Sequence, residues 1–352
     1  MKSNKRRIYY LDVLRVLGCI AVIMIHVSAS FVKNEPVGSM NFWVADVLNG
    51  SARFAVPIFV MISGALLLDE RYHYTNKKLV EHIKRLGVIF IFWSFIYVLV
   101  FQIIGKLVAH ESINWIHSLG SLIGGHYHLW FLYLIIGLYL ILPLLRLWVT
   151  KKNEKYVRYF IGLSLIFAFI LPQIVEIGSN YNSAFDVLNS ILYKKLYLNY
   201  VGGYTTYFLL GWYLNNYVIK NKKLVYMLGL LGVLATIVGT YVFSIVAGKL
   251  VLLDNNLSLN ILFPSVALFV FVRNKYINME AKRGIVNRIA DNSLGVYVAH
   301  ILFVRLFYAI LDAVGCGNVA IVRIPIVFIG TFVCSMLLTS VIRKVPGLRR
   351  VV

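Results

Sequence analysis

Two titratable side chains in the first apolar stretch have a spacing that could support chemistry inside a membrane. Arg15 and His26 both lie within residues 9–31, eleven positions apart. A helix would place them about 16 Å apart along its axis and on nearly the same face. Asp12, three residues before Arg15, is placed to partner the guanidinium. Because an imidazole can transfer protons near neutral pH and a guanidinium can bind anions, the pair predicts acid–base chemistry beside an anion site.

Arg53 is a third basic side chain at predicted membrane depth, within the second apolar stretch. Pro57 follows four residues later and predicts a kink in that helix. The pair Ser63 and Gly64 permits the close approach of a neighbouring helix or of a ligand. Ionisable groups at this depth are costly unless they face protein or water, so Arg53 is a candidate functional residue.

Histidines also occur at the edge of, or within, later apolar stretches. His126 and His128 precede the fourth stretch, with Trp130 close behind, and His300 lies near the middle of the ninth. Arg305 follows His300 on the same stretch. These positions predict a collection of cationic and titratable groups in the outer half of a helix bundle.

Structural roles compete with each of these interpretations. Arg15 could be an end-of-helix residue paired with Asp12, and His26 could be a hydrogen-bonded core histidine. Any one of the histidines at the fourth stretch is more typical of structure than of catalysis, and Trp130 fits the interfacial aromatic belt. Lys84 and Arg85, at the start of the third stretch, could serve only to set topology.

The composition predicts that lipid is the solvent of these elements. The chain of 352 residues is 60% hydrophobic and 14% charged, with a mean hydropathy of +0.79, whereas soluble domains are about 25% charged. Its net charge of +21 would indicate nucleic acid in a soluble protein. Here the basic residues lie between apolar stretches, so the expected partner is the anionic lipid surface, not nucleic acid.

Ten apolar stretches are long enough, or nearly so, to cross a bilayer. We therefore predict an all-α polytopic fold in which residues 1–352 form one membrane domain. The predicted spans are residues 9–31, 42–68, 86–108, 129–149, 157–174, 204–219, 224–248, 257–272, 294–311 and 319–342. The sixth and eighth are short, and the polar, aromatic stretch before the sixth predicts an outer loop lying on the membrane.

The distribution of Lys and Arg predicts the orientation of the chain. With the N-terminus inside, 26 of the 35 basic residues fall in inner segments and 5 in outer loops. This asymmetry favours both termini in the cytoplasm and an even number of spans. Arg15 then lies toward the cytoplasm, and His26 and Arg53 lie toward the outside.

Five motifs together resemble the membrane acyltransferase 3 family. They are Arg15 and His26 separated by ten residues, the run from Arg53 to Gly64, and residues 128–132, 207–211 and 293–300. Each is weakly specific alone, but all five occur in the family's order from about residue 8 to the C-terminus. The resemblance implies a cell-membrane enzyme, expected to be bacterial, that transfers an acetyl or other acyl group from cytoplasmic acyl-CoA to a saccharide outside.

The resemblance also implies roles for particular residues. His26 takes the position of the essential histidine, as base or acyl carrier, with Arg15 as its basic companion and Arg53 before the proline motif. The predicted catalytic set is therefore His26, Arg15 and Arg53. The predicted acyl-CoA contacts are Arg15, Ser63, Lys84 and Arg85. The predicted acceptor contacts are His128, Trp130 and His300.

This sequence departs from the family at one point and leaves other classes open. Where the family often has two arginines separated by two residues, at the start of the third span, the chain reads His82-Ile83-Lys84-Arg85. Acyl-CoA is expected as donor substrate, and no metal is expected. A polysaccharide exporter would also fit ten spans with buried charges, whereas the motifs of glycerolipid acyltransferases and of protein palmitoylation are not found.

Overall fold

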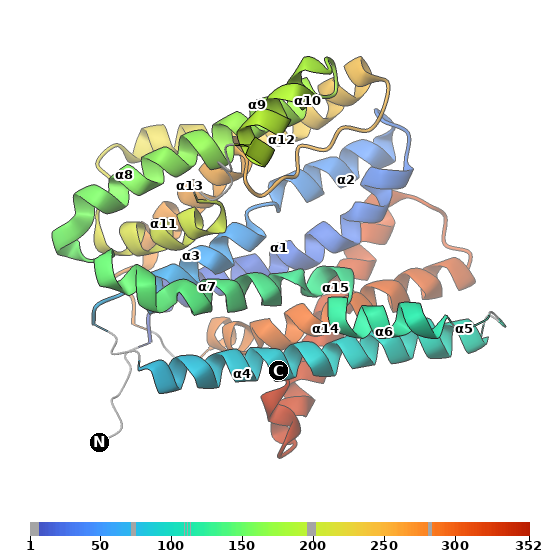
Figure 1. Cartoon of the computed structure of the whole chain (residues 1–352). Coiled ribbons are helices and arrows are strands. Elements are labelled where there is room, and N and C mark those ends of the chain that lie inside the picture. Colours follow the sequence, from blue (N-terminus) through green and yellow to red (C-terminus); the bar gives the residue numbers. More distant parts are fainter. Residues whose placement is uncertain are drawn as a thin grey trace. The chain divides into compact units, whose positions relative to one another are not determined.

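The computed structural model describes residues 7–71, 75–108, 110, 112, 114–195, 202–280 and 284–352. Within these ranges the chain folds into helices, and no strand occurs (Figure 1). Most of the basic stretch that opens the chain, and part of the polar stretch before residue 204, lie outside the described residues. The predicted all-α class is confirmed.

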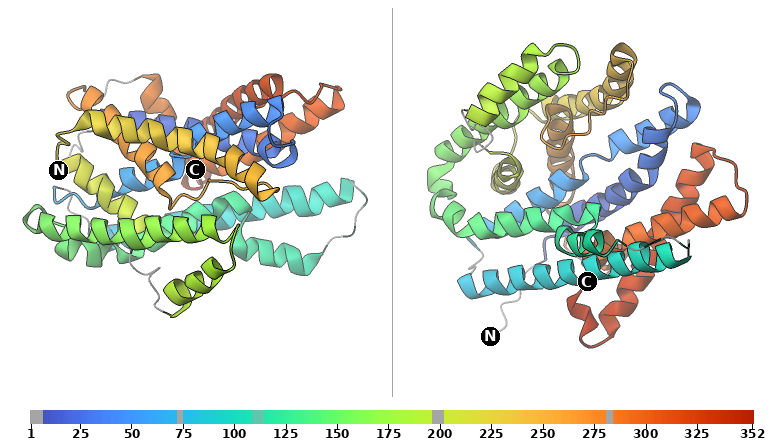
Figure 2. Two further views of the ribbon diagram at one scale, coloured as in Figure 1. Left: turned by 90° about the horizontal axis from the view of Figure 1, so that it is seen from above. Right: turned by 45° about the vertical axis from the view of Figure 1, so that its right-hand side comes forward.

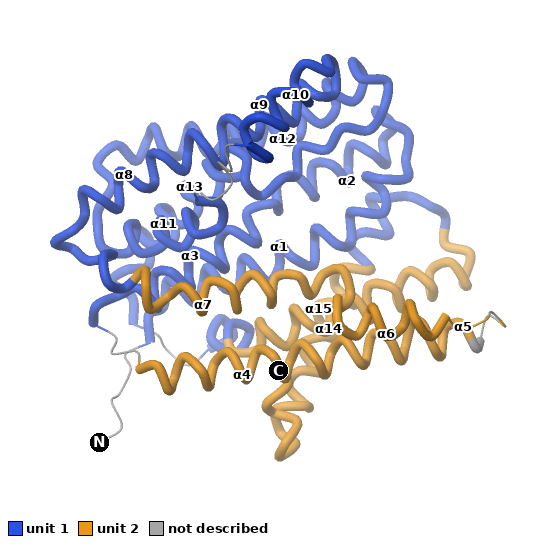
Figure 3. Tube along the Cα trace, viewed as in Figure 1, with its two compact units in different colours: residues 1–72, 146–290, 317–326 blue, residues 73–145, 291–316, 327–352 orange. Residues whose placement is uncertain are grey.

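Contacts divide the chain into two compact units (Figure 3). Unit 1 comprises residues 1–72, 146–290 and 317–326, and unit 2 comprises residues 73–145, 291–316 and 327–352. The helices wholly in unit 1 are α1 (Tyr9–Asn34), α2 (Met40–Ser51), α3 (Ala55–Leu67), α8 (Glu154–Ser164), α9 (Leu171–Gly178), α10 (Ala184–Asn189), α11 (Tyr204–Asn216), α12 (Lys222–Ala247) and α13 (Leu259–Tyr276).

Unit 2 is built from the third, fourth, ninth and tenth predicted spans. Its helices are α4 (Asn76–Tyr97), α5 (Gly105–Val108) and α6 (Trp115–Gly124), together with most of α7 (Trp130–Trp148), α14 (Ile285–Ala313) and α15 (Ala320–Lys344). A π-helical segment, Val98–Ile104, joins α4 to α5.

Eight helical segments among the described residues are long and apolar enough to cross a membrane. They match eight of the ten predicted spans, which confirms a multi-pass membrane protein. The two that do not qualify are those predicted to be short. The predicted span 204–219 contains α11, which ends at Asn216 and has only 13 residues. The predicted span 257–272 overlaps α13, which has 18 residues and ends in a polar segment with Arg273 and Lys275.

The second span is broken at Arg53, as Pro57 predicts. α2 ends at Ser51, residues 52–54 form a turn, and α3 begins at Ala55. A proline ring clashes with the carbonyl four residues earlier, which here belongs to Arg53, and it provides no N–H to bond that carbonyl. The α-helix therefore cannot run regularly through Arg53, and the break turns this side chain away from the regular helical path.

Two of the sequence motifs meet where α3 crosses α11. A Cβ atom on Gly64 would lie 1.8 Å from the carbonyl oxygen of Phe208, and one on Gly211 would lie 1.9 Å from that of Met61. Both helices thus need glycine for their backbones to touch. The close approach predicted at Gly64 is taken by a neighbouring helix of unit 1. Elsewhere in this unit α12 packs along α13 (Figure 2).

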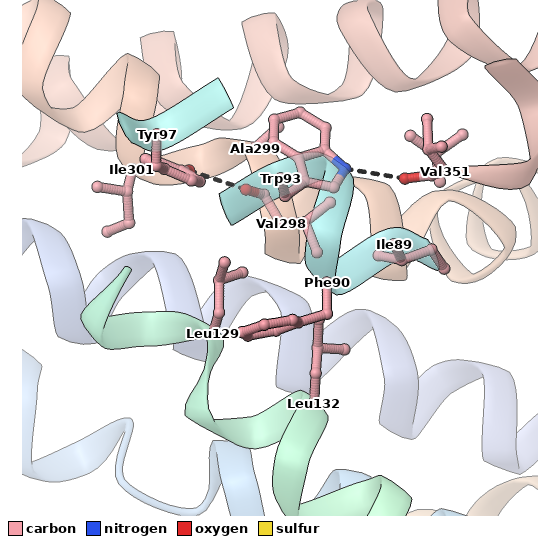
Figure 4. Close-up of a cluster of buried hydrophobic side chains, with 11 residues drawn as sticks. Ile89, Phe90, Trp93, Tyr97, Leu129, Leu132, Val298, Ala299, Ile301 and Val351 are labelled. Carbon is pink, nitrogen blue, oxygen red and sulfur yellow. Dashed lines mark hydrogen bonds between the residues drawn. The ribbon is translucent and has the colours of Figure 1, made fainter. Parts of the chain in front are cut away.

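The core of unit 2 joins α4, α7, α14 and the last residues of the chain (Figure 4). The indole Nε1 of Trp93 donates to the carbonyl oxygen of Val351 at 2.8 Å, and the hydroxyl of Tyr97 donates to that of Val298 at 2.8 Å. Each buried aromatic residue thereby satisfies its polar atom while its ring packs against aliphatic side chains.

Candidate functional site

The N-terminal half of α1 carries a linked group of charges. Asp12 is fully buried and accepts a hydrogen bond from Arg15 Nη1 at 2.6 Å, which confirms the pairing expected from their spacing. Arg7 bonds the same carboxylate through its Nε. Two guanidinium groups thus share one carboxylate, and the group keeps a net positive charge. Arg15 remains 30% exposed, so it can reach an anion from solvent.

Asn215 connects further polar groups at the same end of unit 1. Its side-chain Oδ1 accepts from the Tyr10 hydroxyl and its Nδ2 donates to the carbonyl oxygen of Ala65. Its backbone carbonyl oxygen accepts from Arg273 Nη2. Arg273 is 8% exposed, and its Nε atom has no hydrogen-bond partner within the described ranges. Sequence reasoning counted Arg273 only as a topology-setting charge, because it lies at the end of an apolar stretch.

In the C-terminal half of α1, His26 follows Ile25, whose carbonyl oxygen accepts a hydrogen bond from an amide of α2. His26 is half-buried. Asn49 of α2 donates from Nδ2 to the carbonyl oxygen of Ile25 at 3.0 Å and to Ser28 Oγ at 2.9 Å. These bonds join α2 to the backbone of α1 immediately before His26 and to the Ser28 side chain two residues after it.

Asn49 also holds the guanidinium of Arg53. Its Oδ1 atom accepts from Arg53 Nε at 2.8 Å and from Nη2, and Arg53 Nη1 pairs with Asp254 Oδ2 at 3.0 Å. The Arg53 side chain is 16% exposed. A guanidinium has five N–H groups, so these contacts leave one on each Nη atom without a partner in the part of the chain described here. Those two donors can serve a substrate oxygen.

Asp46 adds a carboxyl group one turn before Asn49 on α2. It is 3% exposed, and its Oδ2 atom has no hydrogen-bond partner among the described residues. The negative charge of Asp46 and the positive charge of Arg53 attract each other. Asp46, Asn49 and Asp254 were missed from the sequence. An acid inside an apolar stretch signals Asp46, whereas only the fold brings Asp254 to Arg53.

Ser63, predicted to contact the acyl-CoA, makes a contact within its own helix. Its hydroxyl donates to the carbonyl oxygen of Phe59 at 2.9 Å, one turn earlier on α3. Ser and Thr commonly bond this way in helices, which satisfies the hydroxyl without a ligand.

The histidines of unit 2 lie in a cluster of aromatic rings. His126 and His128 fall in the break between α6 and α7, with their Nδ1 atoms 2.9 Å apart, and the ring of His300 is centred 5.2 Å from that of His128. His126 stacks on Tyr97 with ring centres 4.5 Å apart. The Tyr297 hydroxyl donates to the carbonyl oxygen of His128. The predicted acceptor residues His128 and His300 are thus brought together, against aromatic rings and backbone oxygens.

The other predicted residues of unit 2 lie nearer its surface. Trp130 opens α7 and is 40% exposed. Lys84 and Arg85 are exposed on α4, and Arg85 Nη2 donates to the backbone oxygen of Val352 at 2.8 Å. The basic pair therefore lies on the helix that leads into the third span, with Nη2 of Arg85 bound to the backbone oxygen of Val352.

The eight candidate spans define a polytopic membrane protein, and the charges of α1, α2 and the turn before α3 form its candidate site. The family model described as an acyltransferase domain, Acyl_transf_3, matches residues 8–340. The chain belongs to the acyltransferase 3 family, and its activity class is acyl transfer at a membrane. Comparisons with curated proteins and with solved structures found no match.

Proposed function

We propose that the protein moves an acetyl group from cytoplasmic acetyl-CoA to a hydroxyl of a saccharide, free or lipid-linked, outside the membrane. The family supplies the activity class, and the donor, the acceptor and the role of each residue are proposed here. The observation that carries the proposal is the contact of Asn49 with both Arg53 and the α1 backbone beside His26. It couples a charged hydrogen-bond donor to the helix that carries a proton acceptor.

The donor enters from the cytoplasmic side in this proposal. Arg7, Asp12 and Arg15 retain a net positive charge, and a partly exposed guanidinium binds phosphate oxygens strongly. The axial distance of about 16 Å from Arg15 to His26 suits an extended pantetheine arm, which would bring the thioester toward His26. Lys84, Arg85 and Ser63 stay in the proposal as further donor contacts.

At the outer end, His26 acts as the general base. Its imidazole takes the proton of the acceptor hydroxyl as the oxygen attacks the thioester carbonyl. The carbonyl oxygen gains negative charge, which the free N–H groups of Arg53 stabilise. The carbon–sulfur bond then breaks, the new ester bond remains, and the proton passes from the imidazole to the thiolate of CoA.

An acyl-imidazole route uses the same residues in two steps. The imidazole nitrogen of His26 first attacks the thioester carbonyl, and the carbon–sulfur bond breaks to release the CoA thiolate. The acceptor hydroxyl then attacks the acetyl-imidazole, its proton passes to the thiolate, and the bond from the acetyl carbon to nitrogen breaks to restore His26. Both routes need His26 and the oxyanion contact from Arg53. They differ in whether radiolabelled acetyl can be trapped on the protein in the absence of acceptor.

The acceptor-side role of His128, Trp130 and His300 remains a prediction. The bonds of His128 and His300 to backbone oxygens, and the ring contacts of all three residues, also support a structural role in unit 2.

Hydrolysis of acetyl-CoA tests the proposal without knowledge of the acceptor. The purified protein should bind acetyl-CoA and slowly release CoA. His26→Ala should bind the donor but lose about 10²–10⁴-fold of the hydrolysis rate, the usual range for removing a general base. Arg15→Ala should raise the Kd for acetyl-CoA about tenfold or more, since hydrogen bonds between charged groups contribute about 1.5–3 kcal/mol.

Matched variants separate these effects from general damage. His117→Ala removes an exposed histidine and Arg158→Ala an exposed arginine, and neither belongs to the proposed site. Both should behave as wild type. A wild-type protein that neither binds nor hydrolyses any acyl-CoA would refute the donor assignment, and full hydrolysis by His26→Ala would refute both catalytic routes.

A further inference from the structure

Unit 1 contains a cavity of about 700 Å³ that the proposed chemistry does not use. It is lined by α9, α10, the π-helical segments on either side of them, and the loop that follows α12. Figure 1 shows α9 and α10 near the end of α12. Cavities that bind small molecules commonly measure about 300–1,000 Å³, and π-helical turns are frequent at functional sites. By the predicted orientation, this cavity is on the outer side.

The lining of the cavity has the chemistry of a saccharide site. Amide side chains of Asn180, Asn189 and Asn255 line it, together with the phenol ring of Tyr193. Amides both donate and accept hydrogen bonds, as sugar hydroxyls require, and an aromatic ring can pack against the apolar face of a sugar. Phe167 and Val175 add apolar surface.

The charged side chains among the described lining residues are both acids, Glu176 and Asp186. Both are exposed to the cavity or to solvent. An anionic group placed here would meet like charge, which costs binding energy, whereas a neutral or cationic group would not.

Hydrogen bonds hold the loop after α12 in place. The backbone N–H of Val251 donates to Ser244 Oγ at 2.8 Å, and Asn260 Nδ2 donates to the carbonyl oxygen of Leu253 at 2.9 Å. Asn255 Nδ2 donates to Glu176 Oε2 at 2.9 Å and so connects the loop to α9. A wall fixed in this way binds its ligand without a large ordering cost.

The same loop reaches the proposed catalytic residue. Asp254 precedes Asn255, and its carboxylate pairs with Arg53 at 3.0 Å. One residue of the loop therefore lines the cavity while its neighbour holds the guanidinium that would stabilise the oxyanion. The lining residue Asn255 therefore directly follows the residue that pairs with Arg53.

We infer that this cavity is an acceptor subsite, separate from the predicted acceptor contacts His128, Trp130 and His300, and that it accepts a neutral or positively charged sugar residue in preference to a uronic acid or sugar phosphate. The inference rests on the proposed function and adds the charge class of the acceptor. It assigns Glu176 and Asp186 the role of excluding anionic sugars.

Reversal of the cavity charge tests the inference. The probes are three oligosaccharides of equal length made of glucose, glucosamine or galacturonic acid. Acetyl transfer from labelled acetyl-CoA is divided by the donor hydrolysis rate of the same preparation. Wild type should favour the glucose or glucosamine oligomer over the galacturonic acid oligomer about tenfold or more, and Glu176→Lys and Asp186→Lys should reduce or reverse that ratio. Glu81→Lys, an exposed charge reversal on α4, should leave the ratio at its wild-type value.

A second measurement needs no turnover. Cysteine placed by Asn180→Cys should react with a maleimide, and the preferred oligosaccharide should slow that reaction at least severalfold, with wild type giving the background from its own cysteines. If no probe protects Cys at this position, or if the charge reversals leave the probe ratio unchanged, the acceptor inference is wrong. Absence of donor hydrolysis in wild type would instead refute the proposed function.

Discussion

The two units stabilise their buried polar groups in different ways. In unit 1, Arg15 is paired with Asp12, and Arg53 is paired with Asp254 and Asn49. In unit 2, His128 and His300 pack against aromatic rings and bond to backbone oxygens, and Arg305 lies over the ring of Phe101 at 4.6 Å. Unit 1 thus pairs the guanidinium charges of Arg15 and Arg53 with carboxylates, whereas unit 2 builds a packed aromatic framework.

The difference indicates which unit could stabilise the negative charge that develops during acyl transfer. A tetrahedral intermediate places a negative charge on oxygen, and a preorganised cation stabilises that charge most strongly where water is excluded. Arg53 meets this requirement because Asn49 and Asp254 orient it before substrate arrives. The rings around His128 offer shape and apolar surface, so we expect changes there to act mainly on folding.

Neutralising Arg53 should produce the largest contrast between the units. Arg53→Gln should lower acetyl transfer about 10²–10³-fold, the usual cost of losing one oxyanion donor. Its thermal midpoint, measured beside that of wild type, separates a loss of transfer from a loss of folding. His128→Gln should lower that midpoint while transfer per folded molecule falls less than tenfold. Transfer and circular dichroism at 222 nm on the same preparations provide both readouts.

Asp254→Asn is the intermediate case. It keeps the shape of the side chain but removes the charge that orients Arg53, so transfer should fall less than in Arg53→Gln. Loss of transfer in His128→Gln at an unchanged thermal midpoint would contradict this difference between the units. In that case the catalytic imidazole would belong to unit 2.

Much of the α1 region could be predicted from the sequence because its information is local. The register of Arg15 and His26 follows from helix geometry, the pairing with Asp12 follows from a spacing of three, and the break at Arg53 follows from Pro57. The partner of Arg53 could not be predicted, because Asp254 is 201 positions away and reaches it through the loop after α12.

The two shortest spans show the limit of apolar length as a signal. α11 has 13 residues, and seven of them are buried against other helices, including the bulky Tyr207, Phe208 and Trp212. Its apolar character serves packing against α3 as much as contact with lipid. Length and hydropathy alone do not distinguish a helix packed against protein from one that faces lipid. Gly64 and Gly211, considered together, would have indicated a helix crossing.

That crossing gives a prediction on stability. Gly64→Ala would place a Cβ atom 1.8 Å from the backbone oxygen of Phe208, so α3 and α11 must separate. Overpacking of this kind costs about 1–3 kcal/mol or more, and the thermal midpoint should fall clearly. Gly137→Ala, on α7 in unit 2, has open space around the new methyl group and should be neutral or slightly stabilising. Equal midpoints for the two variants would show that the helix crossing contributes little to the fold.

The smallest effect on stability is expected from acidification. Lower pH should weaken an ion pair of unit 1 but not a neutral hydrogen bond of unit 2. Asp69, just after α3, is 2% exposed and accepts from the backbone N–H and the Nε of Arg71 at 2.9 Å each. Burial alone would raise the pKa of Asp69, but the hydrogen bonds and charge of Arg71, with the charge of Lys151, lower it overall. A carboxyl whose folded pKa is lowered stabilises the protein above its unfolded pKa of about 3.9, and that contribution is lost as pH falls through the folded value.

Asp69→Asn should therefore reduce the difference in thermal midpoint between pH 7 and pH 3.5. The change should be worth less than about 1 kcal/mol, since the Arg71 side chain is 67% exposed and solvent screens the pair. Trp93→Phe is the counterpart in unit 2. It removes a neutral hydrogen bond to Val351, so it should lower the midpoint by a similar amount at both pH values. If Asp69→Asn shifted both midpoints equally, the Asp69 carboxylate would stabilise unit 1 by packing and not by charge.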